Sequence, residues 1–397
     1  MNRYRHLLLT AAVLGACLPA AAQREAHYDF SVVSQVRIDL RELGYPPVDV
    51  IPSGESAVRA LAVAPDGKLY GATSGDRAHL FVLEPRHGYV VPLGFLPDKT
   101  VHHSLAVAAN GDVYIGTALA VDNNGEGYAP YPGGHLLKYV SKGGGREAIH
   151  VDAACPVEDL GIPVKGQGIY ALTINRLFGT VYGLTYPDGD FFSFDPKTGQ
   201  FKTHGRVADR KMPGEKFENE KNIGRALVVD KEGDVYTTGG DGNFVRLRPN
   251  GEIQALKLTA PTVPGREVYN RVDAWTQDDA GTLYGGTSDG YLFRLDPAKM
   301  RVDNLGKPLN QYRIRGLVWA PNGKLYGVAG DTDEMARLFS YSPSTGAYEM
   351  LGMVDVNRRP FYSWQAYVID AMAIGTDGTV YLGQAERKSK LYLYYPN

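Results

Sequence analysis

One short pattern of apolar and polar positions recurs along most of the chain. Its first copy, Ala60–Tyr70, reads Ala-Leu-Ala-Val-Ala-Pro-Asp-Gly-Lys-Leu-Tyr, which is two apolar runs joined by an Asp-Gly turn. Alternation with a period of two predicts strands, and Asp-Gly or Asn-Gly between two such runs indicates a tight hairpin. Six later copies also end in tyrosine, and they are Ser104–Tyr114, Ala171–Tyr182, Ala226–Tyr236, Ala274–Tyr284, Gly316–Tyr326 and Ala371–Tyr381.

A third strand follows each hairpin, and a weaker fourth strand follows the third. The clearest third strands are His79–Pro85, Phe191–Pro196, Leu292–Pro297 and Leu338–Pro343. Four antiparallel strands in each of seven repeated units are typical of a β-propeller, in which the units are blades around a central axis. The sequence therefore predicts an all-β fold, a seven-bladed β-propeller.

The last unit has only three strands, because its final strand is Leu391–Tyr395. The N-terminal segment Phe30–Asp39 alternates between apolar and polar residues and belongs to no unit. We expect this segment to supply the fourth strand of the last blade. The ring would then close without a free strand edge between its first and last blades.

The first residues are typical of a secretory signal. Arg3 and Arg5 precede an apolar run over residues 7–18, and Ala20-Ala21-Ala22 offers a small-residue cleavage site before Gln23. We expect a signal peptide over residues 1–22 and a single propeller domain over residues 23–397. The expected location is secreted or periplasmic.

The two cysteines bear on how the protein is anchored and whether it can form a disulfide. Lipoprotein anchoring at Cys17 is an alternative, but the alanine-rich cleavage site after it is the cleaner one. Cleavage before Gln23 leaves Cys155 as the only cysteine, so no intramolecular disulfide can form.

Lys+Arg 42 against Asp+Glu 44 gives a net charge of -2, which is not the basic excess of a nucleic-acid-binding protein. Beyond the signal, no stretch approaches the roughly 20 apolar residues of a membrane span.

Seven polar residues stand at equivalent places, each just before an inner strand. These positions converge on one mouth of a propeller, and they are Arg59, His103, Tyr170, Arg225, Asp273, Arg315 and Asp370. His79 heads the third strand of the first blade, and Tyr186 follows the second strand of the blade that carries Tyr170; His102 and His135 are nearby candidates. Solvated first residues of strands would also be polar. It is the mixture of His, Tyr and Arg that indicates a site.

A histidine, a tyrosine and an arginine in one cleft suit β-elimination on a uronic acid sugar. The proton beside the carboxylate is barely acidic, so a cation has to offset the carboxylate charge, and an arginine does this bidentately. A His or Tyr then removes the proton, and another protonates the leaving glycosidic oxygen. No cofactor is required. The sequence has no Gly-x-Ser-x-Gly, Walker, His-Glu-x-x-His or paired-cysteine pattern, and it leaves metal binding unresolved.

The residues at these positions resemble a known family, the seven-bladed propeller polysaccharide lyases, in particular the ulvan lyases and the related rhamnosyl-glucuronate lyases. The motifs that carry the resemblance are Ala78-His79-Leu80-Phe81, His103-Ser104-Leu105, Gly168-Ile-Tyr170-Ala-Leu, Tyr182-Gly-Leu-Thr-Tyr186-Pro and Gly224-Arg225-Ala-Leu. The resemblance implies that His79, His103 and Tyr170 are catalytic, that Arg225 binds the substrate carboxylate, and that the partner is an acidic polysaccharide or oligosaccharide.

The other substrate-binding candidates are Tyr186, Arg315 and Arg59. Tyr186 stands where the resemblance implies a second carboxylate-binding arginine, and Arg315 and Arg59 are expected to bind neighbouring sugars. A non-catalytic propeller that binds glycan or protein through the same mouth is the alternative. A glycosidase normally needs two carboxylates across the scissile bond, and the only acids in the ring, Asp273 and Asp370, are two blades apart.

Overall fold

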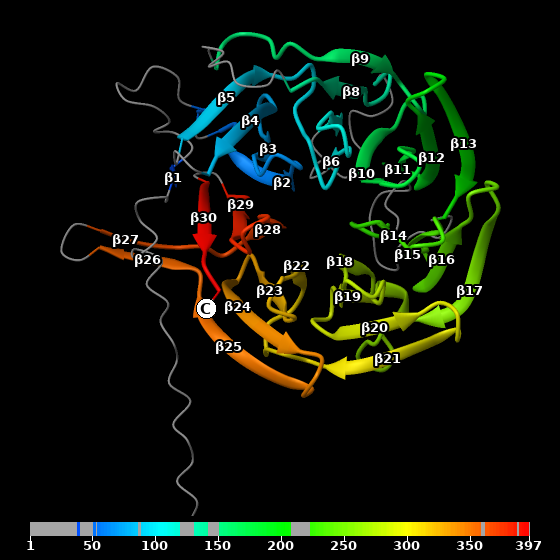
Figure 1. The fold of residues 1–397 in the computed structure, drawn as a ribbon, viewed down its shortest axis with the longest axis vertical. Helices are drawn as coiled ribbons and strands as arrows, with labels where there is room; N and C mark the ends of the chain where they lie inside the picture. The colour runs from blue at the N-terminus through cyan, green and yellow to red at the C-terminus, as the bar shows by residue number, and fades with distance from the viewer. Residues whose placement is uncertain are drawn as a thin grey trace, which may run out of the picture.

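Seven sheets of four strands each stand in a ring around a central axis, which confirms the predicted seven-bladed propeller (Figure 1). The computed structural model describes residues 38–39, 51–52, 54–85, 89–119, 131–141, 151–207, 223–358, 362–386 and 389–396. All hydrogen-bonded strand pairs inside the blades are antiparallel, and the first strand of each blade lies nearest the axis (Figure 1). Within the described residues, no helix has the length and apolar character that a membrane crossing requires.

The first three blades follow one another in the chain. Blade 1 has β2 (Ala57–Val63), β3 (Leu69–Ser74), β4 (His79–Glu84) and β5 (Tyr89–Phe95). Blade 2 has β6 (Leu105–Val107), β7 (Val113–Gly116), β8 (Leu136–Tyr139) and β9 (Glu158–Gly161). Blade 3 has β10 (Gly168–Ile174), β11 (Val181–Tyr186), β12 (Asp190–Asp195) and β13 (Gln200–Arg206).

The next three blades repeat this order. Blade 4 has β14 (Val228–Val229), β15 (Val235–Thr238), β16 (Asn243–Leu247) and β17 (Ile253–Thr259). Blade 5 has β18 (Val272–Gln277), β19 (Leu283–Thr287), β20 (Leu292–Asp296) and β21 (Arg301–Gly306), and a single turn of 3-10 helix, Glu267–Tyr269, precedes it. Blade 6 has β22 (Ile314–Trp319), β23 (Leu325–Asp331), β24 (Glu334–Ser342) and β25 (Ala347–Met353).

Blade 7 is built from both ends of the chain. It combines β28 (Ile369–Ile374), β29 (Val380–Gln384) and β30 (Lys390–Tyr394) with β1 (Ile38–Asp39) as its outer strand. Ile38 is paired with Leu391 and Asp39 with Lys390. The predicted closure is confirmed for these two residues, whereas residues 30–37 of the expected strand and the signal segment 1–22 lie outside the described part of the chain.

A hairpin that the repeat pattern does not predict interrupts the ring order. It consists of β26 (Asp355–Arg358) and β27 (Tyr362–Gln365), which form a two-stranded sheet between blades 6 and 7. Figure 1 shows this hairpin projecting outward from the ring. It lies away from the axis, so it adds no strand to the mouth.

The recurring tyrosine and the glycine that often follows it explain how neighbouring strands pack. All seven repeat tyrosines are buried, and their side chains contribute to apolar clusters that run through and between the blades. In blade 1, Gly71 is paired with Phe81 on the third strand, and a Cβ added at Gly71 would lie 2.1 Å from the Phe81 ring. Three more Gly–Phe pairs repeat this arrangement, and they are Gly183–Phe192, Gly285–Phe293 and Gly327–Phe339. Glycine is therefore required because the aromatic ring occupies the space of its missing side chain.

Candidate functional site

We call the seven polar residues at the mouth the ring residues. Five of them lie at the same backbone irregularity, a β-bulge in the first strand of the blade. In blade 3, the register between β10 and β11 passes from Ile169 to Ala171 and skips Tyr170. The same skip occurs at four other ring residues, namely Arg59, Asp273, Arg315 and Asp370. Such bulges bend a strand locally and re-aim a side chain, and they are common beside functional sites. The sequence places these residues just before their strands, and the structure corrects this: they lie inside the strands, near the start.

The other two ring residues precede their strands, as the sequence predicts. His103 lies before β6, and its carbonyl accepts a hydrogen bond of 3.1 Å from the Leu172 N–H of blade 3. Arg225 lies before β14, and its N–H donates to the Val272 carbonyl of blade 5 at 3.3 Å. Both residues are therefore fixed by backbone contacts to the next blade around the ring.

A cluster of aromatic rings gathers at blades 2 and 3. The centroid of the Tyr170 ring lies 5.1 Å from that of His102, 6.1 Å from that of His103 and 5.8 Å from that of Tyr186. His102 is buried, and neither of its ring nitrogens has a hydrogen-bond partner among the described residues; the same holds for Nε2 of His103. The structure thus brings together His103, Tyr170 and Tyr186 and adds His102 to them.

Burial and positive neighbours keep both histidines neutral. Burial, reinforced by the Arg225 charge, lowers the pKa of His103 to about 3. Burial and then Arg59 hold the pKa of His102 well below its usual value. A neutral imidazole keeps one nitrogen lone pair, so either ring can accept a hydrogen bond at neutral pH.

Asp370 of blade 7 joins three of the ring arginines. Its carboxylate accepts hydrogen bonds from Arg315 Nη1 at 2.6 Å and from Arg225 Nη2 at 3.1 Å, and Arg59 Nη1 lies 3.8 Å away. Burial raises the pKa of Asp370, but Arg225 and Arg315 outweigh it and hold the pKa well below the usual range. Burial likewise lowers the pKa of Arg225, yet Asp370 and Tyr170 together raise it. Arg225 therefore stays charged beside the ionised carboxylate of Asp370.

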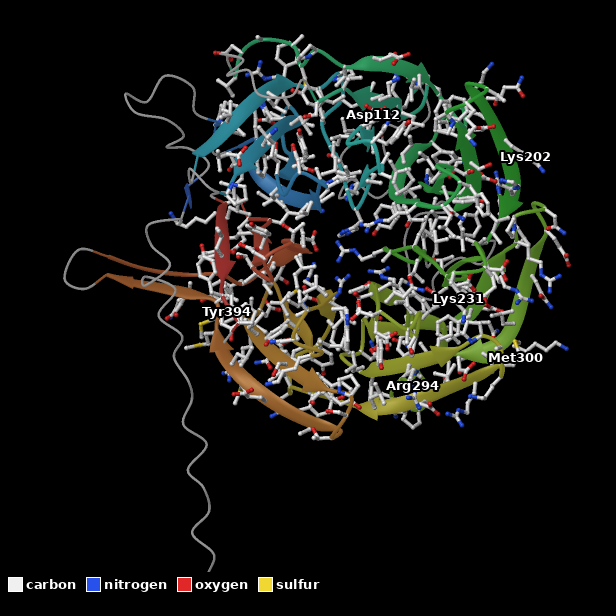
Figure 2. All side chains as sticks on the ribbon, in the orientation of Figure 1. Asp112, Lys202, Lys231, Arg294, Met300 and Tyr394 are labelled. Atoms are coloured by element: carbon white, nitrogen blue, oxygen red, sulfur yellow. The ribbon has the colours of Figure 1, made fainter. Side chains whose placement is uncertain are left out.

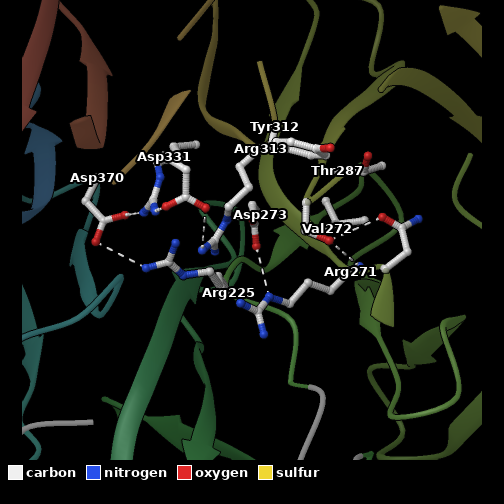
Figure 3. Close-up of polar contacts among 12 residues, drawn as sticks. Arg225, Arg271, Val272, Asp273, Thr287, Tyr312, Arg313, Asp331 and Asp370 are labelled. Atoms are coloured by element: carbon white, nitrogen blue, oxygen red, sulfur yellow. Dashed lines mark hydrogen bonds and ion pairs between the residues drawn. The ribbon is translucent and has the colours of Figure 1, made fainter. Parts of the chain in front are cut away.

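The ion pairs continue from Asp370 through blades 6 and 5 as an alternating series, which we call the arginine–aspartate chain. Its members in order are Arg225, Asp370, Arg315, Asp331, Arg313, Asp273 and Arg271. Figure 3 shows these contacts running across the mouth. Counting Arg59, five arginines share three aspartates, so the cluster carries two excess positive charges. The mouth is therefore suited to bind an anionic ligand.

A central cavity of about 210 Å³ lies below this cluster. Five ring residues contribute to its wall, Arg59, His103, Asp273, Arg315 and Asp370, and leucines and alanines of the inner strands complete it. Figure 2 shows nitrogen-bearing side chains gathered at the centre of the ring. Five of the seven ring residues thus face one space, and Tyr170 and Arg225 are not among the residues that line it.

His79 lies in a different environment from the other catalytic candidates. It is fully buried at the start of β4, and its Nε2 lies 2.6 Å from Glu55 Oε2. Burial lowers the pKa of His79 despite this carboxylate. Its hydrogen bonds within the described residues go to Glu55 and Thr73, and none joins it to His103 or Tyr170. His135 is likewise engaged elsewhere, with Asp159 at 2.8 Å.

Three charged residues of the site are missing from the sequence-based candidates. Arg271 and Arg313 each stand two positions before a ring residue, Asp273 and Arg315, and Asp331 ends β23. The shared spacing of the two arginines is a signal that the sequence offers. Among the described residues, no three His, Cys, Asp or Glu side chains come together to hold a metal ion.

Comparisons with known proteins support the fold. No protein-family model and no curated protein matches the sequence. Among solved structures, the chain is similar to a streptogramin B lyase, with a TM-score of 0.57 and 15% identity over 87% of this chain and 95% of the other. It is also similar to a catalytically inactive histidine-to-alanine variant of virginiamycin B lyase from Staphylococcus aureus with quinupristin, with a TM-score of 0.60 and 11% identity over 88% and 98%.

A third similar structure is the WD40 propeller domain of Doa1, with a TM-score of 0.54 and 12% identity over 86% of this chain and 94% of the other. The same propeller frame thus occurs in lyases and in WD40 domains. At these identities the likeness carries the fold alone, and function has to be argued from the site.

Proposed function

We propose that the protein is a lyase that cleaves a uronic-acid-containing polysaccharide by β-elimination. One observation carries the proposal. At the positively charged mouth, the Arg225 charge faces the Tyr170 hydroxyl, and the Tyr170 ring lies beside the neutral rings of His102 and His103. Two of the similar structures are called lyases, but at 15% and 11% identity they support only the frame.

Carboxylate binding is the first step of this mechanism. The substrate carboxylate is placed near Arg225, and the excess charge of the cluster attracts it. Neutralising the carboxylate stabilises the negative charge that develops when the neighbouring carbon loses its proton. Arg59 and Arg315 share Asp370 with Arg225, so they offset the negative charge of Asp370 and leave more of the Arg225 charge for the substrate.

Proton transfer is the second step. The His103 imidazole accepts the proton from the carbon beside the carboxylate, and the C–H electrons form a double bond as the glycosidic C–O bond breaks. Tyr170 donates its hydroxyl proton to the leaving oxygen. Return of the proton from His103 to Tyr170, through solvent, restores both groups.

The substrate itself strengthens the base in this scheme. The pKa of His103 is low in the free protein because the ring is buried and Arg225 is close. A bound carboxylate offsets the Arg225 charge, so the pKa of His103 rises when an acidic substrate is present and not when a neutral one is. This coupling favours uronic acid sugars over neutral sugars.

The test is a panel of uronic acid polysaccharides, each incubated with the protein and followed by the ultraviolet absorbance of an unsaturated uronyl product. The same polymers with chemically reduced carboxylates serve as substrate controls. His103→Ala and Tyr170→Phe should abolish the signal, whereas His204→Ala, on β13 of blade 3, is the matched histidine control that should retain it. Product without the unsaturated chromophore would indicate hydrolysis and contradict the proposal.

A non-catalytic glycan-binding propeller is the second candidate. The observation that favours it is that Tyr186 stands where the resemblance implies a second carboxylate-binding arginine. On this alternative, the wild type would bind an acidic polymer without cleaving it, and His103→Ala would leave binding unchanged.

A further inference from the structure

The far end of the arginine–aspartate chain is more exposed than the end at Arg225, because the side chain of Arg271 is 25% exposed and that of Arg225 is 8% exposed. Every interior member of the series has a partner on each side, whereas Arg271 has one carboxylate, Asp273, at 3.2 Å. Asp273 is in turn shared with Arg313, whose Nε donates to it at 2.8 Å. Arg271 and Arg313 thus share Asp273, and the second carboxylate near Arg313, Asp331 at 3.7 Å, is itself shared with Arg315, so part of the positive charge is not neutralised.

The exposed fractions show which group faces a ligand. The Asp273 side chain is 0% exposed, whereas the Arg271 side chain is 25% exposed and that of Arg313 is 17% exposed. Burial raises the pKa of Asp273, but Arg313 and Arg271 outweigh it and keep the group ionised. The buried carboxylate therefore holds the two arginines in place, and each of them keeps part of its side chain accessible.

An exposed aromatic residue, Tyr312, directly precedes Arg313 in the chain. Arg313 has a φ of 58°, in the left-handed region that a non-glycine residue rarely adopts. Figure 3 shows that Arg313 points to Asp273 while the preceding Tyr312 points away from it. Tyr312 is 54% exposed, and the Lys307 ammonium lies 4.9 Å from its ring centroid. Strained backbone of this kind clusters at functional sites and ligand clamps.

We propose that Arg271, Arg313 and Tyr312 form a second subsite, which binds an acidic sugar residue of the same polymer at a distance from the cleaved bond. The arginines pair with its anionic group, and the Tyr312 ring contacts the apolar face of its sugar ring. This inference rests on the proposed function and deepens it: the substrate is a polymer that carries negative charge on more than one residue.

The experiment compares the polymer that the wild type cleaves with the shortest oligomer that it still cleaves. Arg271→Gln and Tyr312→Ala should each raise KM for the polymer about 5- to 10-fold, which is the loss of roughly one ionic or stacking contact. Both should change kcat, and KM for the shortest oligomer, much less than KM for the polymer. Arg294→Gln is the matched control, because Arg294 and Arg301 also share one aspartate, Asp303, but lie on β20 and β21 at the outer side of blade 5.

Two results would overturn the subsite. Equal KM values for wild type and both variants on the polymer would show that the contacts serve blade packing alone. An equal rise in KM for polymer and shortest oligomer would show a general distortion of the mouth.

A binding measurement separates this inference from the proposed function. If the wild type cleaves none of the polymers, native electrophoresis through gels that contain polygalacturonate or alginate still detects binding. Retardation that is lost in Arg271→Gln and Tyr312→Ala, and kept in Arg294→Gln, would support the subsite while the lyase proposal fails. A wild type that neither gel retards and that cleaves no polymer would overturn both.

Discussion

Arg225 of blade 4 and Asp370 of blade 7 are joined across the mouth by a hydrogen bond of 3.1 Å, although they lie 145 positions apart in the sequence. Blades 4 and 7 are not neighbours in the ring, so this contact crosses the axis rather than following the blade order (Figure 1). It couples the arginine that the mechanism needs to a carboxylate on the far side.

Replacing Asp370 by asparagine should destabilise the protein strongly. The change keeps the shape of the side chain but removes the negative charge from three arginines, two of which are buried. Breaking a buried pair in this way typically costs about 3–5 kcal/mol. Urea unfolding measures the loss. Asp303→Asn removes the shared carboxylate of two exposed arginines and should hardly change the midpoint; similar midpoints for the two variants would contradict the expectation.

Loss of the proton-transfer groups should lower turnover and spare binding. His103→Ala and Tyr170→Phe should each lower kcat by about 10²–10⁴-fold, because a positioned acid or base contributes that much. Arg225→Ala should raise KM for acidic substrates as well as lower kcat, because it removes carboxylate neutralisation. Steady-state kinetics on the cleaved polymer gives both constants. Near-normal turnover in both His103→Ala and Tyr170→Phe would leave the lyase without a mechanism.

The equivalent test at His79 asks whether the resemblance assigns it correctly. His79→Ala removes a buried side chain and its contact with Glu55, so a fall in stability is expected whatever its role. If His79 is catalytic, both His79→Ala and His79→Gln should lower kcat, although His79→Gln keeps a polar group near Glu55. Recovery of kcat in His79→Gln would assign the residue to the packing of blade 1.

Stability should fall as the solution becomes mildly acidic. The pKa of His103 is about 3 in the native protein and near 6.5 once unfolded, so between these values the unfolded chain binds more protons. The native state therefore keeps its full stability above about pH 6.5 and loses it as the pH falls, by on the order of 2 kcal/mol at pH 5. His102 acts in the same direction.

Urea midpoints between pH 7.5 and 5 measure this dependence. The lowered pKa values of Asp273 and Asp370 add a further loss only below the usual aspartate pKa of about 4, so this window isolates the histidines. His103→Asn should flatten the slope. A wild-type slope of zero would show that His103 titrates normally in the folded protein.

Closure of the ring by the N-terminal segment predicts a stability contribution from β1. Deleting the chain through Asp39 removes the pairing with Leu391 and Lys390 and exposes the edge of β30. The expected loss is at least about 1 kcal/mol, which for a domain of this size is on the order of 1 °C in Tm, and the exposed edge should promote aggregation. Scanning calorimetry and light scattering test both effects, and a deletion that leaves both unchanged would argue against closure by this strand.

Much of the fold follows from periodicity. The repeated hairpin predicts seven blades because each copy carries its own turn and tyrosine, and the leftover segment near Asp39 predicts the closure. The ring residues were located by their equivalent positions, and His103, Tyr170 and Arg225 do meet. The pairing of Arg225 with Asp370 could not be predicted, because it depends on the width of the mouth and on how far an arginine reaches across it.

The β-bulge in the first strand of five blades has a consequence for how the residues at the mouth can be substituted. At Tyr170 and Asp370, as at three other blades, the ring residue lies outside the cross-strand register with the next strand. Its side chain can therefore be exchanged while the neighbouring pairs, such as Ile169 with Thr185 and Ala171 with Leu184, keep their partners. The strand pairing of the blades thus does not depend on which side chain stands at these positions, so a change of substrate requires matched changes among the ion-paired residues around the axis and no rebuilding of a sheet.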